Sequence, residues 1–377
     1  MKHSIKYFII LFGFVLTLNG CEEDKFSDYQ EYISKQYAYP PLFSEQNNYI
    51  VDLYLVNQGV SSNINFSRNH FIPYVYSDKN NEFNWTFDGF LFIEGQTEFD
   101  RGLGISAIKS DWDWLIKKQL KTPGVGVPAL NALLDSLRSA GKVPLRKRKV
   151  VISIPSPTSS DIDWGEIDGK KLNMTNDNDR IKSVKWFIDR VMDEWRKSDF
   201  SELEFSGFYW LHEGETNYTS DRFILPEISR YIKSLGFHFY WIPYFGAHMG
   251  ADWKEWGFDI AYQQPNYFFR HKDEEWPATR LDDACQFASR YNMGLEMELD
   301  GSIKDPLYQK RFVEYLEYFE KHRVLETSPI AHYDDRGTVY QMSVSSNDTL
   351  KVLYEKYMDV VIKRQIQADK LFKDMFK

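Results

Sequence analysis

Two short acidic stretches hold the residues with the clearest potential for chemistry. The first, LEFSGFYWLHEGE, covers 203–215 and carries Glu213 directly after a run of apolar and aromatic residues. The second, MGLEMELD, covers 293–300 and carries Glu296 and Glu298. Cleavage of a glycosidic bond requires one carboxylic acid that protonates the leaving oxygen and a second carboxylate that attacks the anomeric carbon or activates water. The two stretches therefore predict a carbohydrate-cleaving site.

Each stretch has the pattern of a buried strand that ends in polar residues. In a (β/α)8 barrel the loops after the strands form the mouth of the active site, so a carboxylate at a strand end is well placed for catalysis. Side chains alternate along a strand, so Glu296 and Glu298 point to the same side, and either could act as the second carboxylate. Glu298 lies nearer to the end of its strand, which favours it.

From about residue 49 onward, strand patterns alternate with helix patterns. Besides the strand that leads to Glu213, strands are predicted at 50–56, 71–76, 87–93, 149–154, 237–244, 258–264, 294–300 and 330–333. Strands separated by helices at this spacing indicate parallel βαβ units, and we predict an α/β fold with a single (β/α)8 barrel. The count exceeds eight by one, so 71–76 is assigned to an insertion or hairpin. No GxGxxG motif follows a strand and no Walker loop occurs, which argues against a nucleotide-binding fold.

Further polar and aromatic residues fall at predicted strand ends, where they could line a cleft. Amide side chains suit sugar hydroxyls because they donate and accept hydrogen bonds at once. Aromatic rings can stack on the apolar face of a pyranose. The candidates for substrate binding are Glu94, Trp210, His212, Tyr244, His248, Gln263, Gln264, Asn266 and Glu296. Each could be an ordinary loop or core residue, but their repeated placement at strand ends predicts a site.

Composition favours a neutral or cationic ligand over a polyanion. Aromatic residues make up 17% of the chain, enough for both a core and sugar-stacking surfaces. The formal net charge is -9 and no concentrated basic patch occurs, so nucleic acid is a poor candidate partner. His238, His248, Asp252 and His271 are close in sequence, but no HxH or HExxH spacing is present, so neither a metal nor another cofactor is predicted. A metal-dependent hydrolase is the weaker alternative.

The N-terminal segment has the pattern of a lipid-anchored export signal. Lys2 and Lys6 precede an apolar run at 7–18 that is too short to span a bilayer comfortably. LNGC, ending at Cys21, resembles a bacterial lipoprotein box, which implies cleavage before Cys21 and lipidation of it. The EED that follows resembles the export signal of surface-exposed lipoproteins in some Gram-negative bacteria, so we expect an outer-membrane lipoprotein at the cell surface, or alternatively one facing the periplasm. The predicted regions are 1–20 (signal peptide), 21–47 (polar tether) and 48–377 (barrel).

Two family resemblances extend these predictions. The first is carried by FDGFLF (87–92), FYWLHE (208–213), WIPYF (241–245), GFDIAYQQPNYFF (257–269) and GLEMELD (294–300). These segments are similar to an uncharacterised bacterial barrel domain of secreted proteins and lipoproteins. It is a domain of unknown function that is regarded as glycoside-hydrolase-like, which implies a fold and a broad class but no substrate.

The second resemblance is to clan A of the retaining glycoside hydrolases, in which the fourth and seventh strands end in glutamates. It implies that Glu213 is the acid/base and Glu298 the nucleophile. The clan carries Asn before its acid/base, whereas this chain has His212. We therefore predict a hydrolase that cleaves a poly- or oligosaccharide with retention of configuration. The alternative is a surface glycan-binding lipoprotein that keeps the barrel scaffold but lacks catalysis, because aromatic and amide residues serve either function.

Overall fold

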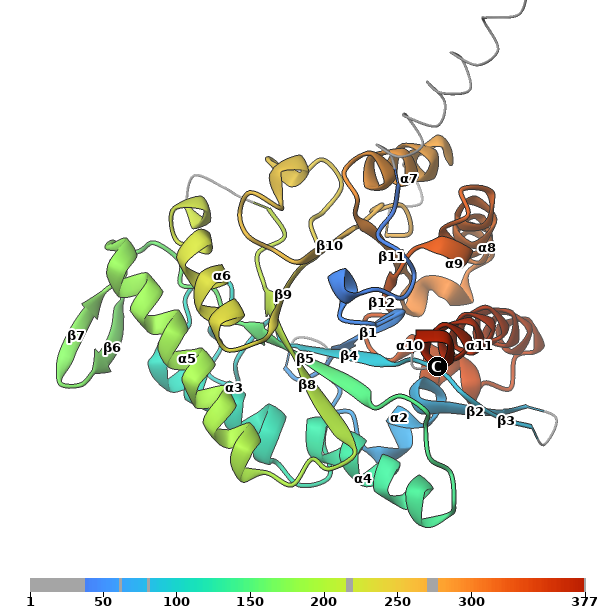
Figure 1. Ribbon diagram of the computed structural model, residues 1–377, viewed down its shortest axis with the longest axis horizontal. Helices are drawn as coiled ribbons and strands as arrows, with labels where there is room; N and C mark the ends of the chain where they lie inside the picture. Colours follow the sequence, from blue (N-terminus) through green and yellow to red (C-terminus); the bar gives the residue numbers. More distant parts are fainter. Residues whose placement is uncertain (1–37, 61–62, 80–81, 215–219, 270–276, 376–377) are drawn as a thin grey trace, which may run out of the picture. The chain divides into compact units, whose positions relative to one another are not determined.

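Eight parallel strands close into a barrel (Figure 1). The computed structural model describes residues 38–60, 63–79, 82–214, 220–269 and 277–375. In chain order the barrel strands are β1 (Asp52–Asn57), β4 (Gly89–Ile93), β5 (Arg148–Ile154), β8 (Leu203–Trp210), β9 (His238–Trp241), β10 (Ile260–Gln263), β11 (Gly294–Glu298) and β12 (Ile330–Tyr333). Each pairs in parallel with the barrel strand before it, and β12 pairs with β1. The predicted (β/α)8 fold is confirmed, with β8 as the fourth barrel strand and β11 as the seventh.

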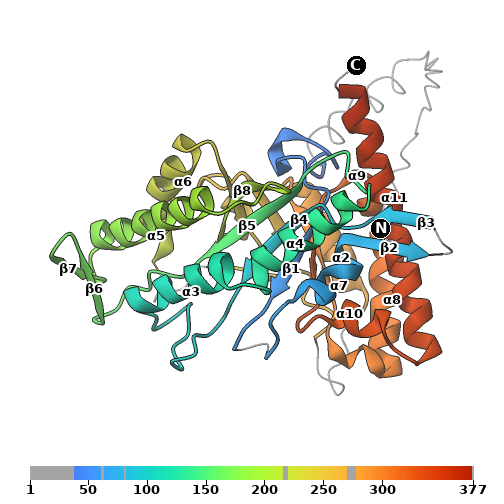
Figure 2. The same ribbon diagram turned by 90° about the horizontal axis from the view of Figure 1, so that it is seen from below.

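Helices form the outer layer around the barrel (Figures 1 and 2). They are α2 (Arg68–Val75), α3 (Lys109–Lys121), α4 (Gly126–Ser139), α5 (Asp177–Lys197), α6 (Leu225–Ser234), α7 (Thr279–Arg290), α8 (Pro306–Lys321), α9 (Val324–Thr327), α10 (Thr338–Ser343) and α11 (Asp348–Met375). Short 3₁₀ turns are η1 (Glu45–Asn47), η2 (Asp221–Phe223), η3 (Gly250–Asp252) and η4 (Gly301–Lys304). In α5 the buried Val184, Phe187, Ile188 and Val191 recur at helical spacing and pack on the barrel.

The prediction of a strand at 71–76 is wrong. Most of this segment belongs to α2, and Tyr76 begins the antiparallel hairpin of β2 (Tyr76–Lys79) and β3 (Glu82–Trp85), which lies beside α11 (Figure 2). The side chains of Ser67 and His70 cap the start of α2. A short apolar run suits either a strand or a buried helix, and periodicity alone does not separate the two. A second hairpin, β6 (Asp163–Ile167) with β7 (Lys170–Asn173), follows β5.

A bulge in β8 decides which of its side chains face the barrel interior. The pairing with β5 skips Ser206, because Phe205 and Gly207 pair with consecutive residues of β5. An extra residue on one strand shifts the alternation of side chains by one position. Phe205 therefore packs in the outer core under the helices, whereas Tyr209 packs in the core inside the barrel. The same shift directs the end of β8, and with it Glu213, toward the barrel axis.

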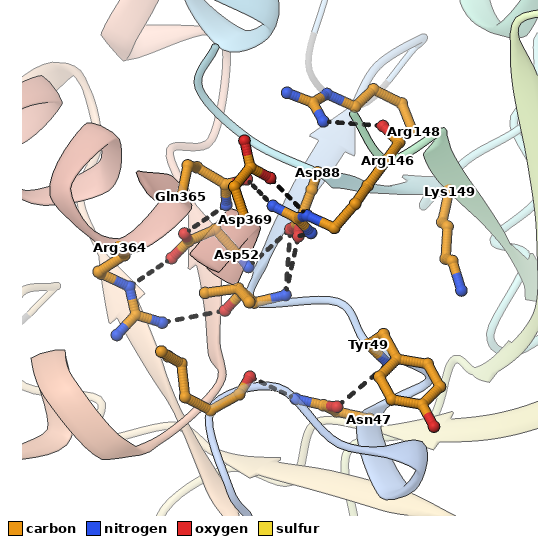
Figure 3. Close-up of polar contacts among 12 residues, drawn as sticks. Asn47, Tyr49, Asp52, Asp88, Arg146, Arg148, Lys149, Arg364, Gln365 and Asp369 are labelled. Atoms are coloured by element: carbon orange, nitrogen blue, oxygen red, sulfur yellow. Dashed lines mark hydrogen bonds and ion pairs between the residues drawn. The ribbon is translucent and has the colours of Figure 1, made fainter. Parts of the chain in front are cut away.

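Paired charges close the N-terminal end of the barrel (Figure 3). Asp52, the first residue of β1, accepts hydrogen bonds from Arg364 Nε at 2.7 Å and Gln365 Nε2 at 2.8 Å. Asp88, just before β4, accepts from Arg146 and from the backbone amide of Asp52 at 2.9 Å. These contacts join α11 to the starts of the barrel strands, and each of the two buried carboxylates has a cationic partner.

Residues 39–47 fall within the predicted tether and contact the barrel. The Tyr39 hydroxyl donates to the carbonyl of Cys285 at 3.1 Å, and Leu42 and Asn47 are buried. The predicted signal peptide and the lipidation site at Cys21 lie outside the described residues. None of the helices in the described part of the chain is long and apolar enough to span a membrane.

Candidate active site

A cavity of about 500 Å³ opens at the carboxyl ends of the barrel strands. It is lined by Leu55, Asn57, Ile93, Glu94, Gly95, Tyr209, Leu211, Glu213, Gln264, Asn266, Phe269, Glu296, Tyr333 and Asp335. These residues belong to β1, β4, β8, β11 and β12, or to the loops directly after barrel strands. The cavity therefore lies where (β/α)8 enzymes place their active sites.

Glu213 enters the cavity from the loop after β8. Its backbone carbonyl accepts a hydrogen bond from the amide of Tyr244 at 3.2 Å, which ties this loop to the one after β9. The side chain is open to solvent at the mouth. Desolvation by the concave surroundings still raises the pKa of Glu213, against opposing effects from Gln264 and from the charge of His212. A carboxyl group with a raised pKa can hold a proton near neutral pH and donate it.

Glu296 lines the same cavity from within β11 and is 3% exposed. Leu295 and Met297 on either side pack under the helices, so Glu296 points into the barrel. Among the described residues, none donates a hydrogen bond to its carboxylate. Burial raises the pKa of Glu296 well above its usual value, and the charges of Glu298 and Glu213 raise it further. Its oxygens are thus free to meet a ligand.

Glu298 faces the same side of β11 but does not line the cavity. It is fully buried, and both oxygens are engaged. Oε1 accepts the amide of Asn266 at 2.9 Å, and Oε2 accepts the amide of Tyr267 at 3.2 Å and the hydroxyl of Tyr315 on α8. Burial raises the pKa of Glu298 to about 7, although these hydrogen bonds oppose the shift. These contacts hold the loop after β10 against α8. Although Glu298 lies nearer to the end of β11 than Glu296 does, its carboxylate faces these donors and not the cavity.

Trp210 and His212 belong to a polar network away from the cavity lining. The Asp221 carboxylate accepts from Trp210 Nε1 at 2.9 Å and from His212 Nδ1 at 2.8 Å. His212 Nε2 donates to the carbonyl of Gly104 at 2.8 Å. Burial lowers the pKa of His212, but the contacts with Asp221 and Gly104 outweigh it and raise the pKa overall. With both ring nitrogens engaged, His212 holds in place the loop that carries Glu213.

The other predicted binding residues divide between the cavity and its surroundings. Those in the lining are Glu94, Gln264 and Asn266. Those outside it are Tyr244 and His248, which are exposed in the loop after β9, and Gln263, which is buried. Gln264 Oε1 accepts from Asn266 Nδ2 at 2.9 Å, and Gln264 Nε2 donates to the carbonyl of Ile242 at 3.0 Å. The amides therefore brace one another as well as facing the cavity.

Sequence reasoning missed the part of the lining that β1, β12 and Tyr209 supply. Asn57 Nδ2 donates to the Tyr333 hydroxyl at 3.2 Å and to Asp335 Oδ1 at 3.4 Å. Tyr209 is buried, and its pKa is raised by burial and by the charges of Glu213 and Glu296. Asn57 and Asp335 lie at or just after strand ends, so the signal that identified Glu94 could also have identified them.

Residues 52–359 match a protein-family model that is described as a domain of unknown function, DUF4855. The chain belongs to this family. The match includes all eight barrel strands and both Glu213 and Glu296, so the predicted membership in a barrel family of unknown function is confirmed. No curated protein matches the sequence.

Solved structures resemble this DUF4855 chain at low identity. Concanavalin B is 11% identical with a TM-score of 0.41, and the match covers 81% of this chain and 98% of that one. The Bacillus subtilis mannanase BCman is 9% identical with a TM-score of 0.37, and the match covers 82% of this chain and 86% of that one. Likeness at this level transfers neither a substrate nor a mechanism to the DUF4855 chain.

Proposed function

We propose that this protein is a glycoside hydrolase that cleaves a poly- or oligosaccharide with Glu213 and Glu296 as its catalytic carboxyl groups. One observation carries the proposal: both groups line a single cavity, from the fourth and the seventh barrel strands, and the pKa of each is raised. Glycoside hydrolysis needs a protonated and an ionised carboxyl group beside the scissile bond. Carboxyl groups with perturbed pKa values in a cleft are the usual candidates for such roles.

Glu213 suits the acid/base role because it combines a raised pKa with access to solvent. The protonated carboxyl donates its proton to the glycosidic oxygen as the bond to the anomeric carbon breaks. In the second half of the reaction the Glu213 carboxylate removes a proton from water, which attacks the anomeric carbon and breaks its bond to Glu296, so that Glu296 leaves as a carboxylate. A group at the open mouth can meet both the leaving sugar and the incoming water.

Glu296 suits the nucleophile role better than Glu298 does. The oxygens of Glu296 face the cavity without a hydrogen-bond donor from the described residues, whereas those of Glu298 accept from two amides and a hydroxyl. When Glu213 is protonated, its repulsion of Glu296 disappears, which favours the ionised form of Glu296. The ionised carboxylate then forms the covalent bond to the anomeric carbon.

The proposal is tested by reducing-end release from a panel of plant, host and microbial glycans. Glu213→Gln and Glu296→Gln should each lower the turnover rate by about 10²-fold to 10⁴-fold or more, because each removes a group that reacts. Asp163→Asn, on the exposed β6–β7 hairpin, is the matched control and should retain activity. Full activity in both glutamine variants would overturn the assignment of Glu213 and Glu296 as the catalytic residues. Binding of a glycan that is never cleaved would favour the alternative of a non-catalytic binding protein.

The pH dependence of kcat/KM provides a second test. Glu296 must lose its proton and Glu213 must keep one, so the profile should be bell-shaped. Because the pKa of each group is raised, both apparent pKa values of the profile should exceed the ordinary glutamate value of about 4.3. A rate that continues to rise below about pH 4 would contradict this assignment.

Retention of configuration is the stereochemical part of the proposal. Retaining enzymes hold their two carboxyl groups about 5–5.5 Å apart and pass through a covalent intermediate. The NMR spectrum of the first-formed product should show the same anomer as the substrate. An inverted anomer would mean that Glu296 activates water and does not attack the sugar itself.

We also propose that lipid on Cys21 anchors the protein in the outer membrane with the barrel at the cell surface. The LNGC and EED segments support this proposal. Cys21→Ala should move the protein from the membrane fraction to the soluble fraction of cells. Protease added to intact cells should digest the wild-type protein. A Cys21→Ala variant that remains in the membrane would contradict the anchor.

A further inference from the structure

One side of the cavity wall gathers polar side chains, three of them acidic, from four neighbouring strands and the loops after them. Around the barrel, β4, β1, β12 and β11 are consecutive. They present what we name the acidic arc, which consists of Asn57, Glu94, Glu296, Tyr333 and Asp335. β8, which leads to Glu213, is not among these strands. The arc is therefore a wall that a bound sugar would meet while Glu213 approaches from another strand.

Hydrogen bonds within the acidic arc fix the position of Asp335. Its Oδ1 accepts from Asn57 Nδ2 at 3.4 Å and from the Tyr333 hydroxyl at 3.3 Å. Arg336 Nε lies 3.3 Å from Oδ2, but the Arg336 side chain is 58% exposed, so solvent screens its charge. Burial raises the pKa of Asp335, and the charge of Arg336 and the hydrogen bond from Tyr333 oppose this shift. Asp335 is thus a positioned acceptor at the cavity wall.

Two other carboxylates of the arc have acceptor atoms without donors. Glu94 Oε2 pairs with Lys118 at 2.7 Å, but Glu94 Oε1 is buried without a hydrogen-bond partner. Glu296 is nine-tenths buried or more and faces the cavity without a donor from the described residues. A buried acceptor without a donor is destabilising, and a ligand that supplies donors or positive charge removes that penalty.

The charged residues of the cavity lining all carry the same sign, although Lys118 and Arg336 outside the lining pair with Glu94 and Asp335. The described lining residues include four carboxylates, Glu94, Glu213, Glu296 and Asp335, and no lysine or arginine. In the part of the chain that the structure describes, no group of three or more His, Cys, Asp or Glu side chains is arranged to hold a metal ion. A sugar carboxylate or sulfate would be repelled, and a hydroxyl would supply donors but no positive charge for Glu296, which has no cationic partner among the described residues. An ammonium group supplies both three donors and a positive charge.

We propose that the cavity binds glycans that carry a free amino group, and that the acidic arc holds the ammonium of a hexosamine residue. This inference names a substrate class for the proposed hydrolase, and it rests on that proposed function. Acetylation of the amine removes the charge and two of the three donors while the rest of the sugar is unchanged. The N-acetylated sugar is therefore the matched comparison, and it should bind more weakly.

Calorimetric titration with monosaccharides tests the inference without any catalytic step. The probes are glucosamine, galactosamine and mannosamine, each beside its N-acetylated form. At least one free amine should bind about tenfold more tightly than its acetylated partner, the factor expected for one charge-assisted hydrogen bond. The preference should shrink as salt is added, because screening weakens the attraction. The inference is overturned when no free amine binds more tightly than its acetylated partner.

Asp335→Asn tests whether the acidic arc causes the preference for the free amine. The substitution keeps the shape and the acceptor oxygen of the side chain but removes its charge, so the ratio of affinities for amine and acetylated sugar should fall about tenfold. Asp163→Asn removes the same charge from an exposed hairpin and should leave the ratio unchanged. Equal melting temperatures of the two variants show that folding is intact, and an unchanged ratio in Asp335→Asn overturns the assignment to the arc.

The two proposals fail in different ways. If Glu213→Gln and Glu296→Gln both retain full hydrolysis, the catalytic assignment is wrong, but an amine preference in titration still supports the acidic arc. If both variants lose hydrolysis of neutral glycans and no amine preference is found, the hydrolase proposal stands and this inference falls.

Discussion

The two ends of the barrel bury carboxylates in opposite ways. At the N-terminal end, burial would raise the pKa of Asp52, but Arg364 and His332 outweigh it and lower the pKa to about 2. At the C-terminal end, burial and neighbouring carboxylates raise the pKa of Glu296 well above its usual value. Asp52 is surrounded by donors, whereas Glu296 has none from the described residues and is repelled by its neighbouring carboxylates. A buried carboxylate without partners destabilises the fold, so its presence at the mouth indicates a role in chemistry.

Breaking the N-terminal network should have the largest effect on stability. Arg364 bonds the Asp52 carboxylate and also donates to the carbonyl of Ser328 at 3.0 Å. Arg364→Met leaves Asp52 with an uncompensated charge and should lower the free energy of unfolding by about 3–5 kcal/mol, measured by chemical denaturation. Arg323→Met, at a side chain that is 72% exposed, should change it by less than about 0.5 kcal/mol. A loss from Arg364→Met as small as the control's would show that the network does not stabilise the fold.

The pH dependence of stability should separate the two ends. The pKa of Asp52 is lowered to about 2 in the folded protein and is about 3.9 in the unfolded chain, so its stabilisation is present above about pH 4 and is lost as the pH falls to about 2. The loss should be roughly 2–3 kcal/mol. Glu296 has the opposite sign: its folded pKa is raised, so its contribution is fully present below about pH 4.3 and is lost as the pH rises through the folded pKa.

Unfolding free energies measured across this pH range for wild type, Asp52→Asn and Glu296→Gln would show both effects. Asp52→Asn should remove part of the loss at acidic pH, and Glu296→Gln should remove part of the loss at alkaline pH. Identical pH profiles for the three proteins would show that neither Asp52 nor Glu296 contributes to the pH dependence of stability.

The bulge in β8 should have a smaller effect, on both stability and turnover. A Cβ at Gly207 would overlap the backbone carbonyl oxygen of His238 on β9. Gly207→Ala should therefore lower the free energy of unfolding by about 1–3 kcal/mol and reduce turnover, because the bulge sets the direction of Glu213. Gly301→Ala meets no atom within 4 Å and serves as the control. Wild-type stability and turnover in Gly207→Ala would show that the bulge does not set the site.

Much of the fold follows from local patterns in the chain. The apolar runs that end at Trp210 and Glu298 are strands because their apolar residues pack on both faces, inside the barrel and under the helices. The exception is the segment that became α2, where an apolar run of similar length lies on a helix. A run this short does not show whether its period is that of a strand or of a helix. Only the prediction of nine strands for an eight-stranded barrel indicated that one of them lay outside the barrel.

The site was harder to predict because its decisive contacts join distant segments. Alternation placed Glu296 and Glu298 on one face, but the donors that occupy Glu298 come from the loop after β10 and from α8. His212 is held by Gly104 and Asp221, which are far apart in the sequence. No pattern near these residues indicates which partners tertiary packing will supply.

The most direct test measures stability and turnover together for Glu296→Gln and Glu298→Gln. The two changes are the same substitution two residues apart on one strand face. We predict that Glu296→Gln keeps or gains stability at pH 8 and loses turnover, because it removes a repelled charge that the reaction needs. We predict that Glu298→Gln lowers stability. The NH₂ group of the new glutamine would face the backbone N–H groups of Asn266 and Tyr267, which donate to the carboxylate in the wild type. A Glu296→Gln variant that is destabilised yet cleaves its substrate at the wild-type rate would contradict the account.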